Sequence, residues 1–229
     1  MDKNIILQIE TATTMCSVAL SAGGSVLALK ELNERNIHAS EITLFINEVM
    51  TQAGVLYSEL NAISVSKGPG SYTGLRIGVS TAKGLCYALD IPLLSVNTLE
   101  AMASGFLQEH PDTDPGALLC PMIDARRMEV YTALFDTMLY SVEPVAAKVL
   151  DDLSFERQLA EGQVIFFGDG ATKTQSLYST NSNYRYVDFE NSAAHLSSLS
   201  SQKFDQGDFE NVAYFEPFYL KDFIAGVSK

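Results

Sequence analysis

The sequence is poor in positively charged residues, poor in cysteine, and without a long hydrophobic run. Its 229 residues include 15 lysines and arginines against 28 acids, a formal net charge of -13. A surface of this sign repels a phosphate backbone, and no run of Lys or Arg offsets the repulsion. We therefore expect no direct nucleic-acid binding by the chain alone.

The 3 cysteines, Cys16, Cys86 and Cys120, stand singly in apolar surroundings. Without a C-x-x-C spacing they indicate buried, reduced thiols rather than disulfides or a metal site. No apolar stretch approaches the roughly 20 residues that span a membrane, and the first residues lack the pattern of a signal peptide. We expect a cytoplasmic protein without membrane contact.

The periodicity of apolar residues predicts two α/β lobes of about 100 residues each. The first has strands at 4–10, 16–21, 25–32, 62–66 and 92–96, with helices at 38–53, 74–89 and from 97 onward. A weaker copy has strands at 118–123, 130–135, near 140, at 164–167 and at 184–189, with helices near 153–160 and 193–202.

This order of elements is that of a ribonuclease-H-like lobe, and its duplication predicts the actin-like, sugar-kinase-like (ASKHA) architecture. We place the lobes at 1–109 and 110–229, with room for the last residues to pack back on the first lobe. The helices that we expect to bind a partner, at 38–53 and 74–89, would belong to the first lobe.

The stretch SKGPGSYTGLRIG, residues 66–78, follows an apolar run and precedes a predicted helix, as phosphate-binding loops do. It lacks the Lys-Ser/Thr ending of the Walker pattern, because Leu75 and Arg76 follow Gly74, and its spacing is one residue too long for G-x-G-x-x-G. A helix N-terminus can still hold an anion, so weak phosphate binding stays open.

Gly74, Gly78 and Ala82 recur every fourth residue and predict a smooth helix face that another helix can approach closely. Either the chain's own first helix fills this groove or a partner does. Because both helices must also cover their own sheet, a second apolar or small face favours a partner. The expected partner-binding residues are Ile42, Phe45, Ile46, Val49, Gly74, Arg76, Ile77, Gly78, Thr81 and Ala82.

Several blocks spread along the whole chain resemble the bacterial TsaB (YeaZ) family. They are residues 9–13 with 16–20, 68–78, 123–126 with 129–131, and 216–221. The resemblance implies a non-catalytic subunit of the machinery that installs threonylcarbamoyl on the adenosine beside the tRNA anticodon. It also implies pairing with the paralogue TsaD, which holds the metal and the transferase site, cooperation with the ATPase TsaE, and a possible homodimer when the chain is alone.

The sequence itself supports an absence of catalysis. TsaD-like paralogues carry a His-x-x-x-His metal pair where this chain has Thr98 and Met102, and neither a hydroxyl nor a thioether replaces an imidazole. The remaining histidines, His38, His110 and His195, have no ligand spacing, and H-E-x-x-H and G-x-S-x-G are missing. We expect no metal and no cofactor; an ATPase or metallopeptidase-like enzyme of the same superfamily is the alternative.

Glu10 and Asp124 each end the first strand of a lobe, where actin-like ATPases place metal-binding acids. Two facing carboxylates could hold hydrated magnesium, but an acid after a strand more often caps the next turn, and we favour the cap. Met128 stands where the family often has glycine, which leaves the local turn geometry open. A vestigial nucleotide cleft would contain Glu10, Thr11, Thr13, Asp124, Gly168 and Gly170.

Overall fold

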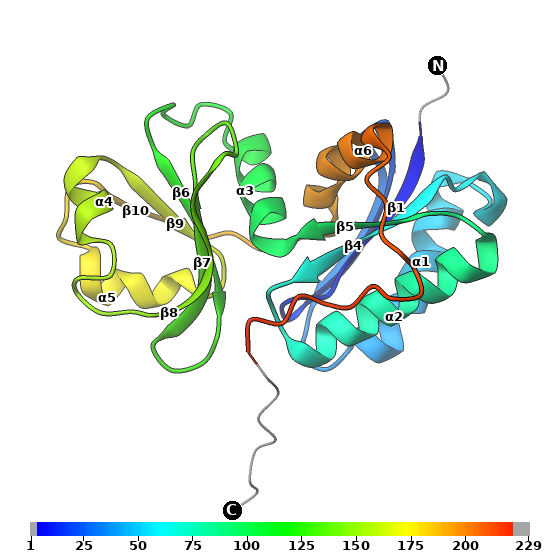
Figure 1. The fold of residues 1–229 in the computed structure, drawn as a ribbon, viewed down its shortest axis with the longest axis horizontal. Coiled ribbons are helices and arrows are strands. Elements are labelled where there is room, and N and C mark those ends of the chain that lie inside the picture. The colour runs from blue at the N-terminus through cyan, green and yellow to red at the C-terminus, as the bar shows by residue number, and fades with distance from the viewer. Residues whose placement is uncertain (1–3, 222–229) are drawn as a thin grey trace, which may run out of the picture.

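The computed structural model describes residues 4–221 and contains two lobes, each built on a five-stranded sheet (Figure 1). The strands of the first lobe are β1 (Ile5–Glu10), β2 (Met15–Ala22), β3 (Ser25–Asn33), β4 (Ala62–Gly68) and β5 (Leu93–Asn97). Those of the second lobe are β6 (Leu118–Asp124), β7 (Glu129–Phe135), β8 (Ser141–Val149), β9 (Val164–Phe167) and β10 (Tyr184–Val187). The helices are α1 (His38–Ala53), α2 (Tyr72–Leu89), α3 (Thr98–Glu109), α4 (Glu156–Glu161), α5 (Gln175–Tyr178) and α6 (Ser197–Gln206), with short 3-10 turns η1 (Tyr57–Glu59), η2 (Ala171–Thr174) and η3 (Ala193–Leu196).

The two sheets have the same topology. The first runs β3-β2-β1-β4-β5, and the second, in the matching direction, β8-β7-β6-β9-β10. In each, three strands form an antiparallel meander and two more add parallel to its first strand. This arrangement confirms the predicted duplication and the predicted fold class.

Helices α1 and α2 cover one face of the first sheet (Figure 1). The apolar stripe of α1 explains its position, because Phe45 and Val49 pack in one core with Ile9 and Val65 of the sheet. Within residues 4–221, no helix combines the length and apolar composition that a membrane span requires.

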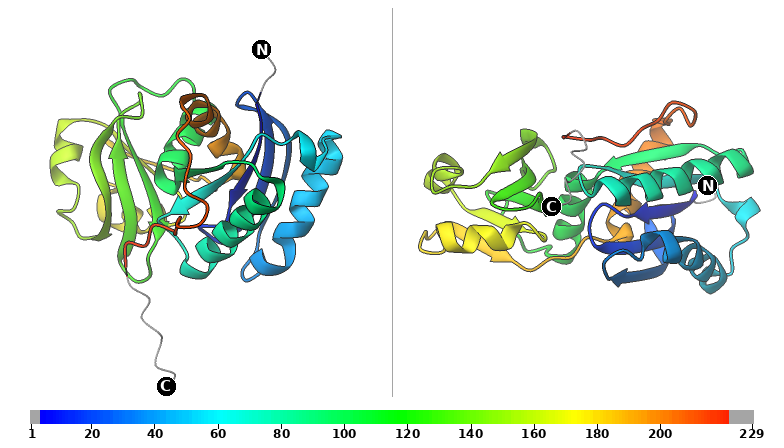
Figure 2. Two further views of the ribbon diagram at one scale, coloured as in Figure 1. Left: turned by 45° about the vertical axis from the view of Figure 1, so that its right-hand side comes forward. Right: turned by 90° about the horizontal axis from the view of Figure 1, so that it is seen from below.

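Helix α6 packs on the first sheet, although it follows the strands of the second lobe (Figure 2). Its Ser200 hydroxyl donates to the Ser64 hydroxyl of β4 at 2.7 Å, and Leu199 packs with Val96 of β5. The prediction that a helix at 193–202 completes the second lobe is therefore wrong. Helical periodicity identifies an apolar face but does not say which sheet that face covers.

Residues 207–221, which we call the C-terminal strap, run along the first lobe after α6 (Figure 1). The Glu210 amide donates to the Leu93 carbonyl at 2.8 Å, and the Phe218 amide donates to the Lys67 carbonyl at 2.7 Å. Because β5 is the edge strand of its sheet, the first of these bonds shields part of an exposed edge.

The glycine face of α2 packs against the turn between β1 and β2. A Cβ at Gly74 would overlap the Thr11 carbonyl oxygen, and one at Gly78 would overlap the Thr11 hydroxyl. The same hydroxyl donates to the Gly74 carbonyl at 2.8 Å. The expectation of an outward groove at these glycines is therefore wrong, and the element that fills the groove is this turn rather than α1.

Gly74 and Gly84 offer a matched test of this packing, because both lie within α2 and only Gly84 has open space at its Cβ position. We expect Gly84→Ala to raise the free energy of unfolding by up to about 1 kcal/mol through helix propensity. We expect Gly74→Ala to lower it by about 1–3 kcal/mol, since overlap with backbone outweighs that gain. Urea denaturation of both variants measures the difference, and equal effects would contradict the packing described here.

Candidate functional site

The acids at the ends of β1 and β6 occupy equivalent positions and make equivalent hydrogen bonds. Oε1 of Glu10 accepts the Ala12 amide at 2.6 Å, and Oδ1 of Asp124 accepts the Arg126 amide at 2.5 Å. Each carboxylate thus binds the amide two residues further along and stabilises the turn that leaves its strand. These contacts confirm that both acids cap turns.

The Glu10 carboxyl is completely buried. Burial raises its pKa to about 7, although hydrogen bonds from the Ala12 amide and the Ser66 hydroxyl act in the opposite direction. Oε2 of Glu10 has no hydrogen-bond partner among residues 4–221, and neither has the side-chain amide of buried Asn191. The end of β1 therefore holds a carboxyl that gains or loses its proton near neutral pH.

Asp124 is more exposed than Glu10 and has its own counter-ion. Nζ of Lys173 lies 2.8 Å from Oδ1 of Asp124 and also donates to the Glu129 carbonyl at 2.7 Å. Partial burial acts to raise the pKa of Asp124, but Lys173 and the Arg126 amide outweigh it and lower the pKa. In the described part of the chain, no three His, Cys, Asp or Glu side chains are grouped to hold a metal ion.

Of the other predicted cleft residues, Gly168 and Gly170 pack tightly against β6, whereas Thr13 lines a pocket. Thr13 accepts the Met15 amide at 3.2 Å and, with Asp169, lines a pocket of about 110 Å³. A Cβ at Gly168 would overlap the Met122 carbonyl, and one at Gly170 would lie 2.9 Å from the carbonyl carbon of Ile123 in β6. Close packing on β6 thus accounts for both glycines, and nucleotide binding at the junction of the lobes stays a prediction.

The glycine-rich loop before α2 is enclosed by the chain itself. Its Ser71 amide donates to the Ala12 carbonyl at 2.6 Å, and the Ser71 hydroxyl accepts the Gly74 amide at 3.3 Å. On the other side, a Cβ at Gly68 would lie 2.6 Å from the Phe218 carbonyl oxygen of the strap. These contacts explain the glycines without a bound phosphate.

Comparison with known proteins assigns the chain to a family. The family model described as TsaD, tRNA N6-adenosine threonylcarbamoyltransferase, matches residues 31–214. The tRNA threonylcarbamoyladenosine biosynthesis protein TsaB of Escherichia coli is 32% identical over 227 residues, which cover 96% of each chain. The chain belongs to the TsaB family.

Solved structures agree with this fold. YeaZ from Pseudomonas aeruginosa is 23% identical and superposes with a TM-score of 0.79 over 95% of this chain and 100% of the other. The activator of 2-hydroxyisocaproyl-CoA dehydratase from Clostridium difficile, solved with bound ADPNP, has a TM-score of 0.52 at 7% identity over 90% and 98% of the two chains. These likenesses agree with the predicted two-lobed, actin-like fold.

The two positions at which the resemblance places the metal-binding histidines of TsaD serve packing here. Thr98, the first residue of α3, accepts the Gly68 amide at 3.1 Å and so holds the glycine-rich loop. Met102, one turn later, is buried, and its terminal methyl lies against Gly168 of the second lobe. The Thr98 hydroxyl therefore links α3 to the first lobe, and the Met102 side chain links it to the second.

The histidines have structural contacts. Nε2 of His38 lies 3.1 Å from the Met15 carbonyl, and Nδ1 of His110 lies 3.1 Å from the Phe106 carbonyl. His195 is buried with Nε2 at 3.0 Å from Glu109, and burial lowers its pKa.

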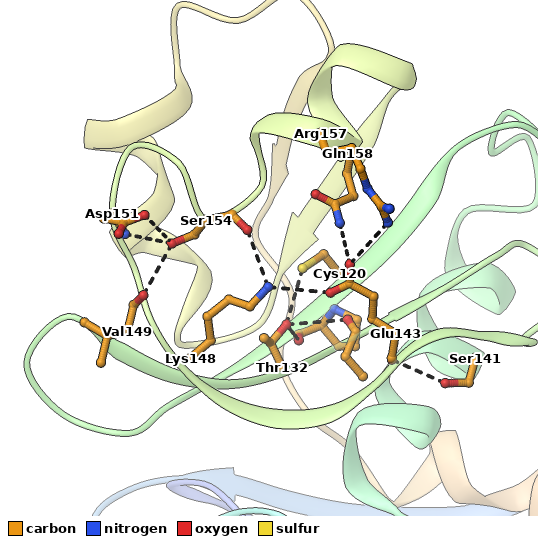
Figure 3. A network of polar contacts seen from close by, with 12 residues as sticks. Cys120, Thr132, Ser141, Glu143, Lys148, Val149, Asp151, Ser154, Arg157 and Gln158 are labelled. Carbon is orange, nitrogen blue, oxygen red and sulfur yellow. Dashed lines mark hydrogen bonds and ion pairs between the residues drawn. The ribbon is translucent and has the colours of Figure 1, made fainter.

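The cysteines are buried, as predicted. Figure 3 shows Cys120 in the polar network of the second lobe, where its sulfur lies 3.3 Å from the Thr132 hydroxyl. Burial raises the pKa of this thiol to about 12, so the thiolate that a nucleophile requires does not form near neutral pH. Lys148 completes the network by contacting Glu143 and the face of Phe155.

Most of the predicted partner-binding residues belong to the core of the first lobe. The buried ones are Ile42, Phe45, Ile46, Val49, Gly74, Gly78 and Ala82. Arg76 is exposed, and Ile77 and Thr81 are half-buried. The prediction is corrected for the buried residues, because an apolar stripe at helical spacing covers the helix's own sheet before it serves a partner.

The surface of these helices carries residues that the sequence reasoning missed. Leu44 of α1 is 54% exposed, Tyr87 of α2 is 87% exposed, and Gly84 of α2 has no atom near its Cβ position. The signal was available, since all three lie off the apolar stripes that identified the helices.

Glu10→Gln tests the buried carboxyl at the end of β1. Because the folded state keeps the Glu10 proton up to a pH of about 7 and the unfolded chain releases it near 4.5, the free energy of unfolding of the native chain should fall as pH rises through this window. The glutamine side chain of the variant cannot ionise. The free energy of unfolding of the variant minus that of the native chain should therefore increase by up to about 3 kcal/mol between pH 4.5 and 8. Urea denaturation at several pH values measures this, and parallel curves for both proteins would contradict the assignment.

Proposed function

We propose that this chain is a non-catalytic subunit in the biosynthesis of threonylcarbamoyladenosine in tRNA, and that it supports a TsaD-type threonylcarbamoyltransferase. The observation that carries the proposal is the match to TsaB of Escherichia coli along 96% of both chains. Thr98 and Met102 support the non-catalytic role, because their contacts occupy them in packing.

The surface proposed for TsaD is the outward side of α1 and α2. Leu44 and Tyr87 are large apolar side chains exposed there, and Gly84 lets another backbone approach α2 closely. Arg76, Ile77 and Thr81 would extend this surface along α2. The same surface would serve a homodimer when TsaD is absent, so the two assemblies would exclude each other.

The larger assembly would include the ATPase TsaE and would be cytoplasmic, as tRNA modification requires. The alternative is an ATPase or metallopeptidase-like enzyme, for which the junction of the lobes would be the site. Glu10 is the group in favour of that alternative, since a carboxyl with a pKa near 7 suits acid–base chemistry.

Tyr87→Ala tests the partner surface. We expect it to weaken TsaD binding by roughly 30-fold, the effect of losing an aromatic anchor of about 2 kcal/mol, without lowering the melting temperature. Gly84→Leu should have a similar effect by obstructing close approach. Tyr140→Ala, at a tyrosine of the second lobe that is 66% exposed, is the control and should bind normally. Calorimetric titration with the TsaD of the same organism measures all three, and normal binding by both α2 variants would place the interface elsewhere.

Metal and nucleotide assays distinguish the two functions. We expect the purified chain to contain no stoichiometric zinc or iron, because its histidines are engaged in separate contacts. We also expect it to hydrolyse no ATP, as the proposed non-catalytic role requires. Elemental analysis and a phosphate-release assay test this. One equivalent of tightly bound metal that disappears in His38→Ala or His195→Ala would favour the enzyme.

A further inference from the structure

The turn between β6 and β7 contains two consecutive arginines in a conformation that favours glycine. Arg126 has a φ of 71° and Arg127 a φ of 50°. The turn is closed by the Ala125 amide donating to the Glu129 carbonyl at 3.1 Å and by the Glu129 amide donating to the Arg126 carbonyl at 3.1 Å. Such backbone conformations cost stability, and they are retained where the position of a side chain matters.

Both arginine side chains are exposed, and neither forms an ion pair or a hydrogen bond with residues 4–221. The neighbouring cations differ, because Lys173 is paired with Asp124 and Lys221 of the strap with Glu129. The turn thus presents two exposed guanidinium groups on a chain whose net charge is -13.

The position of the turn connects it with the proposed partner surface. The strap reaches the base of the turn through the Lys221–Glu129 ion pair. Three residues earlier, the Phe218 amide holds the strap to Lys67, and Tyr219 accepts a hydrogen bond from Arg76 of α2 at 3.2 Å. Through Tyr219 and Lys221, the strap thus connects α2 to the base of this turn.

We propose that Arg126 and Arg127 contact the phosphate backbone of the tRNA in the assembled complex. This inference rests on the proposed function. Guanidinium groups pair with phosphates through planar, bidentate hydrogen bonds, and two consecutive arginines on one exposed turn offer two such groups. The acidic remainder of the chain opposes RNA binding in isolation, so the contact forms only when the partner supplies the main binding surface.

The test uses the complex of this chain with TsaD and an in vitro transcribed tRNA. Arg126→Gln/Arg127→Gln should weaken tRNA binding roughly tenfold at low salt and reduce the slope of log K against log salt by about 1 for each guanidinium. The control, Arg35→Gln/Arg185→Gln, removes the same charge at two other exposed arginines and should leave the slope unchanged. An equal loss in both variants would mean a general charge effect and would overturn the proposal.

A second variant separates recognition from folding. Arg126→Asn/Arg127→Gly suits the left-handed backbone, so we expect its melting temperature to rise by about 2 °C or more while tRNA binding falls. A lower melting temperature would show that the arginines stabilise the turn and would overturn the proposal. Calorimetric titration with TsaD, without RNA, completes the design. Reduced TsaD affinity in the arginine variants would assign the turn to a protein contact and overturn the proposal, whereas absence of TsaD binding by the native chain would overturn the proposed function itself.

Discussion

Helix α2 lies so close to the turn between β1 and β2 that no side chain fits between them, and the positions of several other parts follow from this contact. Thr11 binds the Gly74 carbonyl, and the Ser71 amide binds the Ala12 carbonyl. The turn thereby closes over the end of β1, where Glu10 is buried beneath it. The contact also fixes the rotation of α2 about its axis, so that Gly84 and Tyr87 point away from the sheet.

The same contact explains why a loop that resembles a phosphate-binding loop is occupied by protein. Phosphate-binding loops use glycine so that backbone amides can approach the ligand. Here the backbone of the β1–β2 turn approaches instead, and the strap lies against Gly68 from the other side. At the end of β6, the Lys173 ammonium group lies against Asp124. The glycine-rich loop and the Asp124 carboxylate thus each have partners within the chain.

The sequence predicted the strands and most of the helices, because periodicity reflects burial of a strand or helix face, but it missed the short elements η2 and α5. It was insufficient for contacts between distant elements. In the sequence, Gly74, Gly78 and Gly84 are three glycines of one predicted helix with nothing to distinguish them. In the structure, Thr11 lies against Gly74 and Gly78, whereas Gly84 has open space at its Cβ position. Periodicity in the sequence does not indicate which sheet α6 packs on. It also does not indicate the path of the strap, because backbone hydrogen bonds such as that from Phe218 to Lys67 hold it in place. The turn-capping role of Glu10 and Asp124 was predictable, because it depends on residues two positions apart.

The strap gives the two proposed surfaces a physical connection. The ring of Tyr219 lies against that of Tyr72 with centroids 4.8 Å apart, and the Tyr219 hydroxyl accepts a hydrogen bond from Arg76. Lys221, two residues further on, pairs with Glu129 at the turn that contains Arg126 and Arg127. Arg76, which belongs to the proposed partner surface, therefore contacts the segment that ends at the second lobe. Within residues 4–221, the strap thus adds a connection between the lobes to the one that α3 makes. Binding on the first lobe would thereby restrict where the second lobe presents the turn that contains Arg126 and Arg127.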